Sequence, residues 1–415
     1  MSGTFWFAQK SFRESVSFFS VTTIDKKIVH RHKHDLTEEL MSTTKLIYGI
    51  SHYNANLFYA TQYHAPDAYL FLLHNGRKYM IMKQLEYDKA KRLAKVDEII
   101  RLEPFWQRTG KSIPKSDYDI DVIDEVLKEF GIKTFQVPEM SSLLLVDELR
   151  KKGYTIEGVE DPFFPERQRK TKEEKKHIET SQKAAYGAMD LVENILRKSR
   201  VRNGRLIYRN KTLTSEVLRA EIGIYLLSRG CLANDPIIAG GVQGCDPHER
   251  GTGPLKANQS IIVDIYPSSI KTGYYGDTCR TFCKGKASDA LKKLYATVLD
   301  AQLACLKKIK AGVNGRTIHE ANQKFFESKG YKTEEKKGRM QGFFHGTGHS
   351  LGIEPHEEPA RINRRDYTLE EGNVLSVEPG LYYPDIGAVR IEDLVYVTKT
   401  GCDVIGKYPK KLEIR

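Results

Sequence analysis

The sequence predicts an α+β fold in two domains, a smaller α/β domain at the amino terminus and a larger, pseudo-symmetric domain at the carboxy terminus. A chain of 415 residues exceeds the size at which a single hydrophobic core usually stops growing. Strand and helix signals alternate over residues 46–159, which is typical of an α/β domain. After residue 171 the order helix, helix, strands occurs twice, and this repeat indicates two similar halves.

Residues 1–40 are predicted to be a poorly ordered extension, because strand-like sequence begins only after Met41. The extension is basic and contains serine, but it lacks the continuous apolar core and the small-residue cleavage site of a signal peptide. Initiation of translation at Met41 is the alternative. Detection of an amino-terminal peptide containing Trp6 in the native protein would exclude it.

The composition predicts a soluble globular protein, with 40% hydrophobic and 29% charged residues. No apolar run approaches the roughly 18 residues that a membrane span requires. The net charge is +12, but basic and acidic residues are mixed, as in residues 167–176, which favours a solvated surface over nucleic-acid binding. The six cysteines form no CxxC pair, which favours a reducing compartment, so we expect a cytoplasmic protein.

Residues 41–160 are predicted to form the amino-terminal domain. The dipeptide Asn75-Gly76 between two apolar runs predicts a β-hairpin. Helices are predicted near residues 121–130 and 141–152, each followed by a glycine. Residues 161–170 interrupt both periodicities with prolines and charges, so we predict that they are the linker.

Residues 171–415 are predicted to form the second domain. Thr171 and Glu174 fit a capping box at the start of a long helix. The predicted helices span residues 171–196, 214–229, 288–310 and 317–329. Strands are predicted after each pair of helices, up to Cys283 in the first half and from Gly342 in the second.

Four carboxylates and one histidine lie in apolar or glycine-rich sequence in this domain. The segments are IIVDIYP (261–267), GYYGDTCRTF (273–282), HGTGHSLGIEPHEEP (345–359), SVEPGLYY (376–383) and VRIEDLVYV (389–397). They supply, in chain order, Asp264, Asp277, His349, Glu378 and Glu392. Ionised carboxylates cannot share one pocket without a compensating charge, and two divalent cations would cancel four negative charges. The segments therefore predict a metal site.

Strand patterns indicate which carboxylates face that site. Asp264 ends an apolar run, and the turn residues that follow predict a hairpin that returns to Asp277, so these two lie on adjacent strands. Alternation within residues 389–397 places Arg390 and Glu392 on one strand face and Asp393 on the other. Glu392 is therefore favoured over Asp393 as a ligand.

The ligand types indicate the metal and the reaction. Oxygen-rich ligation with one imidazole favours a hard first-row ion such as Mn²⁺, with Co²⁺, Zn²⁺ and Fe²⁺ as alternatives. Two ions about 3.5–4 Å apart can activate a water and polarise a carbonyl, which implies hydrolysis. Cys279 and Cys283 are alternative ligands, but the carboxylates already fill the site and free cysteines behave as small buried hydrophobes, so we place them in the core.

These segments resemble those of the pita-bread metallopeptidases, which include Xaa-Pro aminopeptidases, prolidases, methionine aminopeptidases and metal-free creatinases. The likeness covers roughly residues 171–408, and the five candidate ligands follow the family order. Residues 41–160 resemble the creatinase-type amino-terminal domain more distantly. Creatinases lack the ligand set and are disfavoured. The chain departs from the family pattern after Asp264, where Ile265-Tyr266-Pro267 replaces a small residue and an enlarged hairpin tip is expected.

The resemblance implies roles for individual residues. Asp264 would bind one metal, His349 and Glu378 the other, and Asp277 and Glu392 would bridge the two. His248 and His356 would hydrogen-bond the substrate and stabilise the tetrahedral intermediate, and Glu378 would accept the proton of the attacking water. Arg390 would orient the neighbouring carboxylates. His345 would line the pocket for the residue after the scissile bond, with a structural role as the alternative.

The resemblance also implies an activity, the release of the amino-terminal residue from peptides whose second residue is proline. Proline lacks an N–H and fixes φ, so ordinary peptidases handle it poorly. Prolidase, which cuts only Xaa-Pro dipeptides, is the alternative, because the same metal core serves both activities. A non-catalytic scaffold that binds peptides is the second alternative, disfavoured because no ligand is missing. Methionine aminopeptidases lack the amino-terminal domain. Dimers are common in the family, so a homodimer is compatible with the resemblance.

Overall fold

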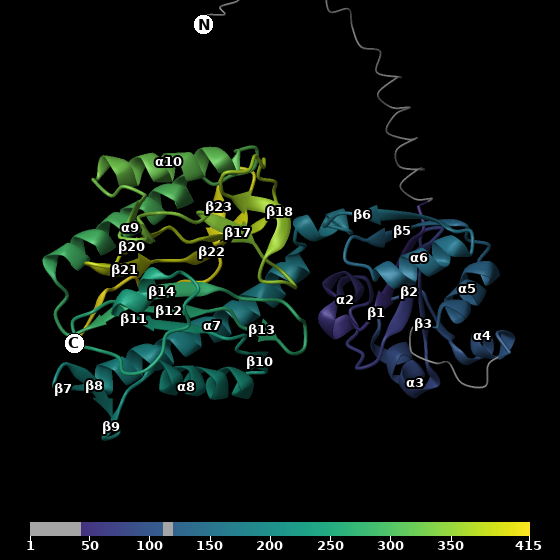
Figure 1. The fold of residues 1–415 in the computed structure, drawn as a ribbon, viewed down its shortest axis with the longest axis horizontal. Helices are drawn as coiled ribbons and strands as arrows, with labels where there is room; N and C mark the ends of the chain where they lie inside the picture. Colours follow the sequence, from purple (N-terminus) through teal and green to yellow (C-terminus); the bar gives the residue numbers. More distant parts are fainter. Residues whose placement is uncertain (1–42, 111–118) are drawn as a thin grey trace, which may run out of the picture.

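The computed structural model of the chain describes residues 43–110 and 119–415. The extension predicted at residues 1–40 lies outside them. Figure 1 shows two domains next to each other along the long axis of the molecule, the smaller amino-terminal domain on the right and the larger domain on the left. No helix in the two described stretches is long and apolar enough to cross a membrane.

The amino-terminal domain is built on a six-stranded sheet in the order β4-β3-β2-β1-β5-β6. The strands are β1 (Lys45–Gly49), β2 (Tyr69–His74), β3 (Arg77–Met82), β4 (Glu98–Arg101), β5 (Thr134–Pro138) and β6 (Thr155–Val159). The predicted hairpin is confirmed, because β2 and β3 pair up to His74 and Arg77. Asn75 and Gly76 between them have φ values of 51° and 73°, as a two-residue turn of this kind requires.

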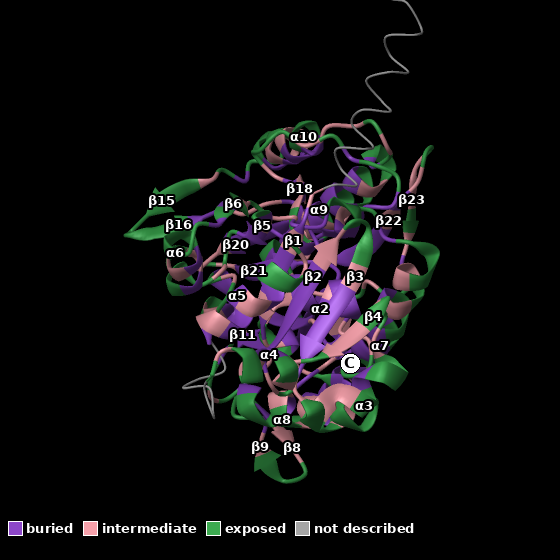
Figure 2. Cartoon of the chain, turned by 90° about the vertical axis from the view of Figure 1, so that its right-hand side faces the viewer, coloured by how far each residue is buried: buried purple, intermediate pink, exposed green. Residues whose placement is uncertain are grey.

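Helices cover both faces of this sheet. They are η1 (Ser51–Tyr53), α2 (Ala55–Thr61), α3 (Gln84–Leu93), α4 (Glu103–Arg108), α5 (Ile120–Glu129) and α6 (Leu143–Lys151). Alternate residues of β2 face opposite sides, so Leu70 and Leu72 pack with α4, α5 and α6, whereas Phe71 packs with α2 and α3. Figure 2 shows the resulting buried strands β1 and β2 among helices with exposed outer faces.

The segment predicted to be the linker is packed between the two domains. Residues 161–170, here called the strap, contain the short helix η2 (Pro165–Gln168). Phe163 and Phe164 lie in the same core cluster as Phe71 of the amino-terminal domain. A few residues later, Arg167 and Lys170 are also buried, and the Lys170 N–H donates to the Gly372 carbonyl of the second domain at 2.8 Å. The strap therefore takes part in the packing of both domains.

The second domain repeats one arrangement of helices twice. Its helices are α7 (Lys172–Lys198) and α8 (Ser215–Ser228) in the first half, and α9 (Asp289–Lys308) and α10 (Gly315–Ser328) in the second. The predicted capping box is present at the start of α7, where Thr171 Oγ1 accepts from Glu174 N at 3.2 Å and Glu174 Oε2 accepts from Thr171 N at 2.7 Å. Figure 1 shows α7 and α8 below the strands of the domain and α9 and α10 above them.

Two main sheets lie between these helix pairs. The first has the order β11-β12-β14-β24 and the second the order β18-β17-β19-β22-β23. Their strands are β11 (Ile237–Gly240), β12 (Ile261–Ile265), β14 (Thr278–Lys284), β24 (Glu413–Ile414), β17 (Gly348–Ser350), β18 (Glu357–Ile362), β19 (Val374–Val377), β22 (Asp393–Val397) and β23 (Cys402–Val404). A short 3-10 helix, η3 (Gly241–Cys245), follows β11. The smaller sheets are β7-β8-β9, β10-β13, β15-β16 and β20-β21. Their strands are β7 (Arg200–Arg202), β8 (Arg205–Tyr208), β9 (Lys211–Thr212), β10 (Cys231–Leu232), β13 (Ser268–Ser269), β15 (Glu334–Lys336), β16 (Arg339–Gln341), β20 (Gly380–Tyr383) and β21 (Gly387–Arg390).

The alternation of residues 389–397 suggested a single strand, but the structure divides this segment into two strands. It is divided between β21, which pairs with β20, and β22, which pairs with β19 and β23. Ile391 and Glu392 lie between these strands, and the Glu392 N–H donates to the Cys279 carbonyl of β14 at 3.0 Å. The chain changes sheets here because this bond attaches it to the first half, while the alternation of side chains continues across the break.

The enlarged hairpin tip expected after Asp264 reaches the amino-terminal domain. The tip contains β13, which pairs with β10, and a bridge between Ser268 and Tyr275. At Gly273, whose φ is +72°, an added Cβ would lie 2.8 Å from the Phe58 ring of α2. Glycine therefore permits the close approach of the tip to the first domain.

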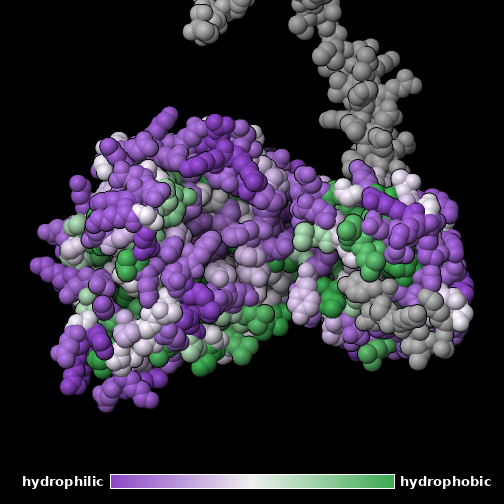
Figure 3. Space-filling model, viewed as in Figure 1, coloured by the Kyte–Doolittle hydropathy of each residue, from purple (hydrophilic) through white to green (hydrophobic). Residues whose placement is uncertain are grey.

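The surface is mostly hydrophilic on the side drawn in Figure 3. Hydrophobic residues are visible along the lower edge of the second domain, where α8 lies. Ile224 and Leu227 of this helix are 70% and 61% exposed.

Candidate metal centre

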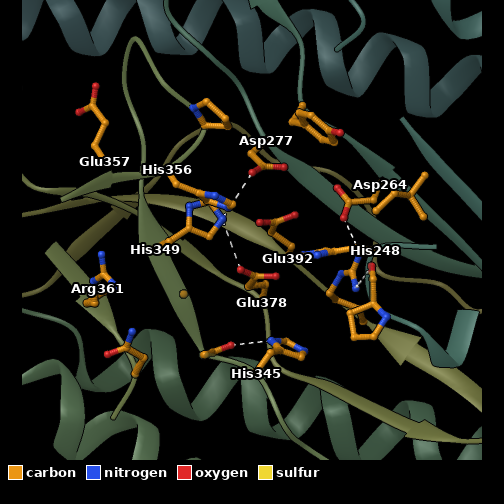
Figure 4. Close-up of a pocket in the computed structure, with 18 of the residues that line it drawn as sticks. His248, Asp264, Asp277, His345, His349, His356, Glu357, Arg361, Glu378 and Glu392 are labelled. Carbon is orange, nitrogen blue, oxygen red and sulfur yellow. Dashed lines mark hydrogen bonds and ion pairs between the residues drawn. The ribbon is translucent and has the colours of Figure 1, made fainter. Parts of the chain in front are cut away.

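A cavity of about 660 Å³ lies in the second domain and contains every residue that the sequence singled out for the site. These residues are His248, Asp264, Asp277, His345, His349, His356, Glu378, Arg390 and Glu392. They come from both halves of the domain, since Asp264 lies in the first sheet, Asp277 directly precedes strand β14 of that sheet, and His349 lies in the second sheet. Figure 4 shows Asp277, Glu378 and Glu392 near the middle of the cavity, with His349 and His356 on one side and Asp264 and His248 on the other.

Backbone pairing places the two aspartates side by side. Asp264 of β12 pairs with Cys279 of β14, and Asp277 is two residues before Cys279, so the three side chains share one face. Asp277 is held by Gln182 of α7, whose side chain accepts from the Asp277 N–H at 2.7 Å and donates to its carbonyl at 2.9 Å. Gln182 was not predicted to take part, because a glutamine inside a long amphipathic helix carries no distinguishing pattern.

A close approach between β17 and β19 brings His349 to Glu378. An added Cβ at Gly348 would lie 1.9 Å from the Ser376 carbonyl oxygen, so only glycine fits there. The Ser376 hydroxyl accepts from the His349 N–H at 3.0 Å and donates to Glu378 Oε1 at 3.2 Å. Ser376 was missed as a site residue, although it lies in the segment that supplied Glu378.

Three of the five predicted ligands form a tight group. Asp277, His349 and Glu392 each offer a ligand atom, and these atoms lie within 4.8 Å of one another. Glu378 joins them, because its Oε1 lies 3.4 Å from His349 Nε2. Asp264 lines the same cavity, but its Oδ2 is paired with Arg390 at 2.5 Å. The structure thus places four predicted ligands within a few ångströms of one another and the fifth next to a cation.

When its carboxyls are ionised, the group carries negative charge that no ion pair with a lysine or arginine of the described residues balances. Burial raises the pKa of Asp277 well above its usual range, and Asp264 and Glu378 raise it further. Burial and Asp277 likewise raise the pKa of Glu392, and burial raises that of Glu378 to about 7. Asp277 Oδ1 is buried and lacks a hydrogen-bond partner within residues 43–110 and 119–415. A divalent cation fits this set, because it would supply both the missing charge and the missing partner.

His349 is prepared to act as a ligand. Burial lowers its pKa to about 4, so the imidazole is neutral near pH 7. Its Nδ1 lies 3.2 Å from the Ser350 carbonyl oxygen, which accepts only if Nδ1 carries the proton. The lone pair of Nε2 then points toward Asp277 and Glu378. A hydrogen bond of this kind commonly fixes the tautomer of a metal-ligating histidine.

The remaining histidines occupy different positions around the group. The His356 ring meets the His349 ring edge to face, with centroids 4.3 Å apart. His345 is fixed by protein groups, since its Nδ1 lies 2.7 Å from the Gly346 carbonyl and its Nε2 accepts from the Tyr382 hydroxyl at 2.8 Å. His248 lines the wall near Asp264 (Figure 4). The position of His345 suits the structural alternative as well as pocket lining.

Arg390 and Tyr382 form a second layer behind Asp264. One Arg390 nitrogen donates to Asp264, while the other donates to the Tyr382 hydroxyl at 3.0 Å and to the Pro247 carbonyl at 3.2 Å. Tyr382 in turn donates to His345. This layer agrees with the orienting role expected of Arg390, and Tyr382 was missed because an uncharged tyrosine within an apolar strand suggests only packing.

The sequence profile of metallopeptidase family M24 matches residues 176–399, which is more than half of the chain. The chain is 35% identical over 196 residues to the uncharacterized peptidase YqhT of Bacillus subtilis, a match that covers 47% of the chain and spans about half, 53%, of that relative. It is 27% identical over 368 residues to a Xaa-Pro dipeptidase of Pyrococcus horikoshii, which covers 86% of the chain and 92% of the relative.

Solved structures show the same two-domain fold. The X-Pro aminopeptidase of Thermotoga maritima superposes with a TM-score of 0.75 at 24% identity, over 91% of this chain and 99% of that one. The Xaa-Pro dipeptidase of Bacillus anthracis superposes with a TM-score of 0.73 at 26% identity, over 93% and 98% of the two chains. The predicted fold, an α/β amino-terminal domain followed by a pita-bread domain, is confirmed. With this fold and with the profile match over more than half of its length, the chain belongs to metallopeptidase family M24.

Proposed function

We propose that this M24 metallopeptidase releases the amino-terminal residue from peptides whose second residue is proline, with two divalent metal ions in its site. The observation that carries the proposal is the uncompensated group of Asp277, His349 and Glu392, with ligand atoms within 4.8 Å of one another in the cavity. The names of relatives support the choice of substrate, since they include both an X-Pro aminopeptidase and Xaa-Pro dipeptidases.

Each residue of the cavity has a separate task in this proposal. Divalent ions held by the five ligands would lower the pKa of a bound water and polarise the scissile carbonyl. Glu378 lies among the ligands and accepts the proton of the attacking water. His356 and His248, on either side of the ligands in Figure 4, donate hydrogen bonds to the peptide as negative charge develops on its carbonyl oxygen.

The donor set favours Mn²⁺, because it is rich in oxygen. Cys279 is buried in a core cluster with Ile262 and Tyr382, and its thiol donates to the Arg390 carbonyl at 3.8 Å, so it is not offered to the metals as a ligand. Mn²⁺ is proposed on this chemistry. The cytoplasmic location and the homodimer stay predictions.

A dipeptidase is the second candidate, and one cavity residue favours it. Arg361 lines the cavity, and its buried Nε has no hydrogen-bond partner in the described part of the chain. A bound Xaa-Pro dipeptide would carry its terminal carboxylate inside the cavity, where an arginine could bind it. The cavity volume of about 660 Å³ lies within the range of about 300–1,000 Å³ that holds drug-sized ligands, so a tripeptide also fits.

Hydrolysis of Gly-Pro and of Gly-Pro-X by the Mn²⁺-loaded protein separates the two candidates. We expect release of glycine from Gly-Pro-X, and cleavage of Gly-Pro alone would establish the dipeptidase. A panel of Gly-Y-X peptides that differ only in Y tests the preference for proline. Equal cleavage across the panel would contradict the proposed specificity while leaving the peptidase activity in place.

Metal binding separates an enzyme from a peptide-binding scaffold. The proposal predicts that purified protein contains divalent metal and that EDTA lowers its melting temperature. Because a ligand that binds only the native state stabilises it by about 2.7 kcal/mol at a concentration one hundred times Kd, added Mn²⁺ should raise the melting temperature measurably. Absence of metal and of any shift would favour the scaffold.

A further inference from the structure

A cluster of four charged side chains, three of them buried, lies beside the metal centre and connects it to the strap. The cluster consists of Arg167 and Lys170 of the strap and Glu357 and Glu354 of the second domain. The side chains of Arg167, Lys170 and Glu357 are 4%, 1% and 5% exposed. Glu357 follows His356 directly and lines the same cavity as the metal centre. We call this group the strap cluster.

Glu357 closes the loop that carries His356. Its Oε1 accepts from Arg167 at 2.7 Å and from the Ile353 N–H at 3.0 Å, and its Oε2 accepts from Lys170 Nζ at 2.6 Å. Ile353 lies within residues 351–356, the loop between β17 and β18. At Gly352 an added Cβ would lie 2.7 Å from the Glu357 carboxylate, so the loop is folded tightly around this side chain. Figure 4 shows Glu357 on the far side of His356 from the ligands.

Arg167 connects this loop to the amino-terminal domain. One guanidinium nitrogen donates to Asn56 Oδ1 of α2 at 2.7 Å, and the other donates to Glu357 and, at 2.8 Å, to Glu354. Asn56 is itself held by Asp161, the first residue of the strap, at 2.9 Å. A continuous chain of hydrogen bonds therefore runs from the first domain through the strap to the residue beside His356.

The charges of the strap cluster balance. Two cations face two carboxylates, so the formal charges cancel, although Arg167 Nε is buried without a hydrogen-bond partner among the described residues. Burial alone would raise the pKa of Glu357, but Lys170 and Arg167 lower it to about 2, so the carboxylate is ionised near neutral pH. Loss of one cation would leave this buried charge partly unpaired, and the loop would have to open or rearrange to hydrate it.

We propose that Arg167 and Lys170 are positioning residues. Through Glu357 they fix the loop 351–356 so that His356 stays against His349, and Asn56 makes the amino-terminal domain part of the same support. The inference rests on the proposed function, in which His356 binds the substrate. The strap therefore supports catalysis by positioning His356, a role that a simple covalent linker would not have.

The first test measures the loop directly and does not depend on activity. Amide hydrogen exchange in the Mn²⁺-loaded full-length protein should rise at least tenfold over residues 351–357 in Arg167→Met and Glu357→Gln. In both variants, the side chain that accepts from the Ile353 N–H is no longer held in place by a charged pair with Arg167. Asp124→Asn, which removes a partly buried carboxylate from α5 of the amino-terminal domain, should leave this segment unchanged. Unchanged exchange in both strap-cluster variants would overturn the inference.

The second test asks whether the effect passes through His356. Glu357→Gln should lower kcat for a Gly-Pro-X peptide at least tenfold with metal content unchanged, and Asn56→Ala should lower it about threefold. In a His356→Ala background, Glu357→Gln should have little further effect on kcat, since two residues that act as a unit are not additive. Additive losses would exclude positioning through His356.

These outcomes distinguish failure of the inference from failure of the proposed function. A wild-type protein that cleaves no Xaa-Pro peptide would refute the function, while the exchange experiment would still decide whether the strap cluster fixes the loop. If Arg167→Met does not fold, Asn56→Ala and Glu357→Gln provide the same comparison with less disturbance of buried charge.

Discussion

The molecule buries carboxylates in two neighbouring regions that differ in their counter-charges. Glu392 and Asp393 are adjacent in the chain, yet their side chains point in opposite directions. Asp393 accepts from Arg280 at 2.7 Å, from Lys410 at 2.6 Å and from Gln302 at 3.0 Å. In residues 43–110 and 119–415, no lysine or arginine is ion-paired with Glu392, Asp277 or Glu378.

The difference appears in the proton affinities of the two residues. Burial raises the pKa of Asp393, but Arg280 and Lys410 lower it below the usual range. Burial raises the pKa of Glu392, and Asp277 raises it further. A buried carboxylate with its own cations is part of the structure, whereas a group of carboxylates without them needs cations from outside the chain. The comparison teaches that counter-charge, more than burial, distinguishes a metal site from an internal ion pair.

The largest expected effect comes from removing a charge from the uncompensated region. Asp277→Asn should lose bound metal and reduce kcat/KM by about 10³-fold or more, since a metal contributes several kcal/mol of charge stabilisation in the transition state. Metal analysis and steady-state kinetics measure both. Normal metal content in the variant would contradict the role of Asp277 as a shared ligand.

Removing a charge from the paired region should affect stability instead. Asp393→Asn should lower the free energy of unfolding of the metal-free protein by about 3 kcal/mol, because it leaves the buried Arg280 and the partly buried Lys410 without their carboxylate. Asp277→Asn is the matched control and should leave the stability of the metal-free protein equal or higher. Urea denaturation of both variants measures the difference. If Asp277→Asn were the less stable of the two metal-free variants, the proposed difference between the two regions would be wrong.

His356→Ala should separate binding of metal from catalysis. Metal content should stay near normal while kcat falls about 10²-fold, the typical loss when one hydrogen-bond donor to a developing oxyanion is removed. If the metal site empties, His356 belongs to the ligand set and not to the substrate-binding residues.

The smallest expected effect concerns pH and the strap cluster. The pKa of Glu357 is lowered to about 2 in the folded state from an ordinary value of 4.5, so its contribution is present above pH 4.5 and is lost as the pH falls toward 2. The free energy of unfolding should therefore decrease over this window by about 2 kcal/mol more in the wild type than in Glu357→Gln. If the free energy of unfolding of the wild type and of Glu357→Gln decreased in parallel over this pH range, the cations would not be stabilising the ionised carboxylate of Glu357.

Much of the fold and the outline of the site could be predicted from the sequence. Local patterns sufficed for the Asn75-Gly76 hairpin and the capped start of α7, because their causes lie within a few residues. The ligand set could be proposed because Asp, Glu and His in apolar strands are costly without a purpose. The choice of Glu392 over Asp393 followed from alternation that continues across the change of sheet at Ile391.

The remaining features depend on contacts between distant parts of the chain. Arg167 and Glu357 are 190 residues apart, and the composition of the strap resembles that of any charged linker. The pairing of Asp264 with Arg390 reduces the uncompensated charge that we counted from the sequence, and it became visible only when both strands were in place. Ser376, Tyr382 and Gln182 carry no formal charge, so no local pattern marked them.

The packing of the strap has a practical consequence for dissecting the protein. Phe163 and Phe164 lie in the core of one domain, while Arg167 and Lys170 pair with Glu357 in the other, a few residues further along. A fragment expressed from Thr171 onward would lack both cations and keep the acid they neutralise. Inactivity of such a truncation would then report a damaged histidine loop, and it could not be taken to mean that the missing domain touches the peptide.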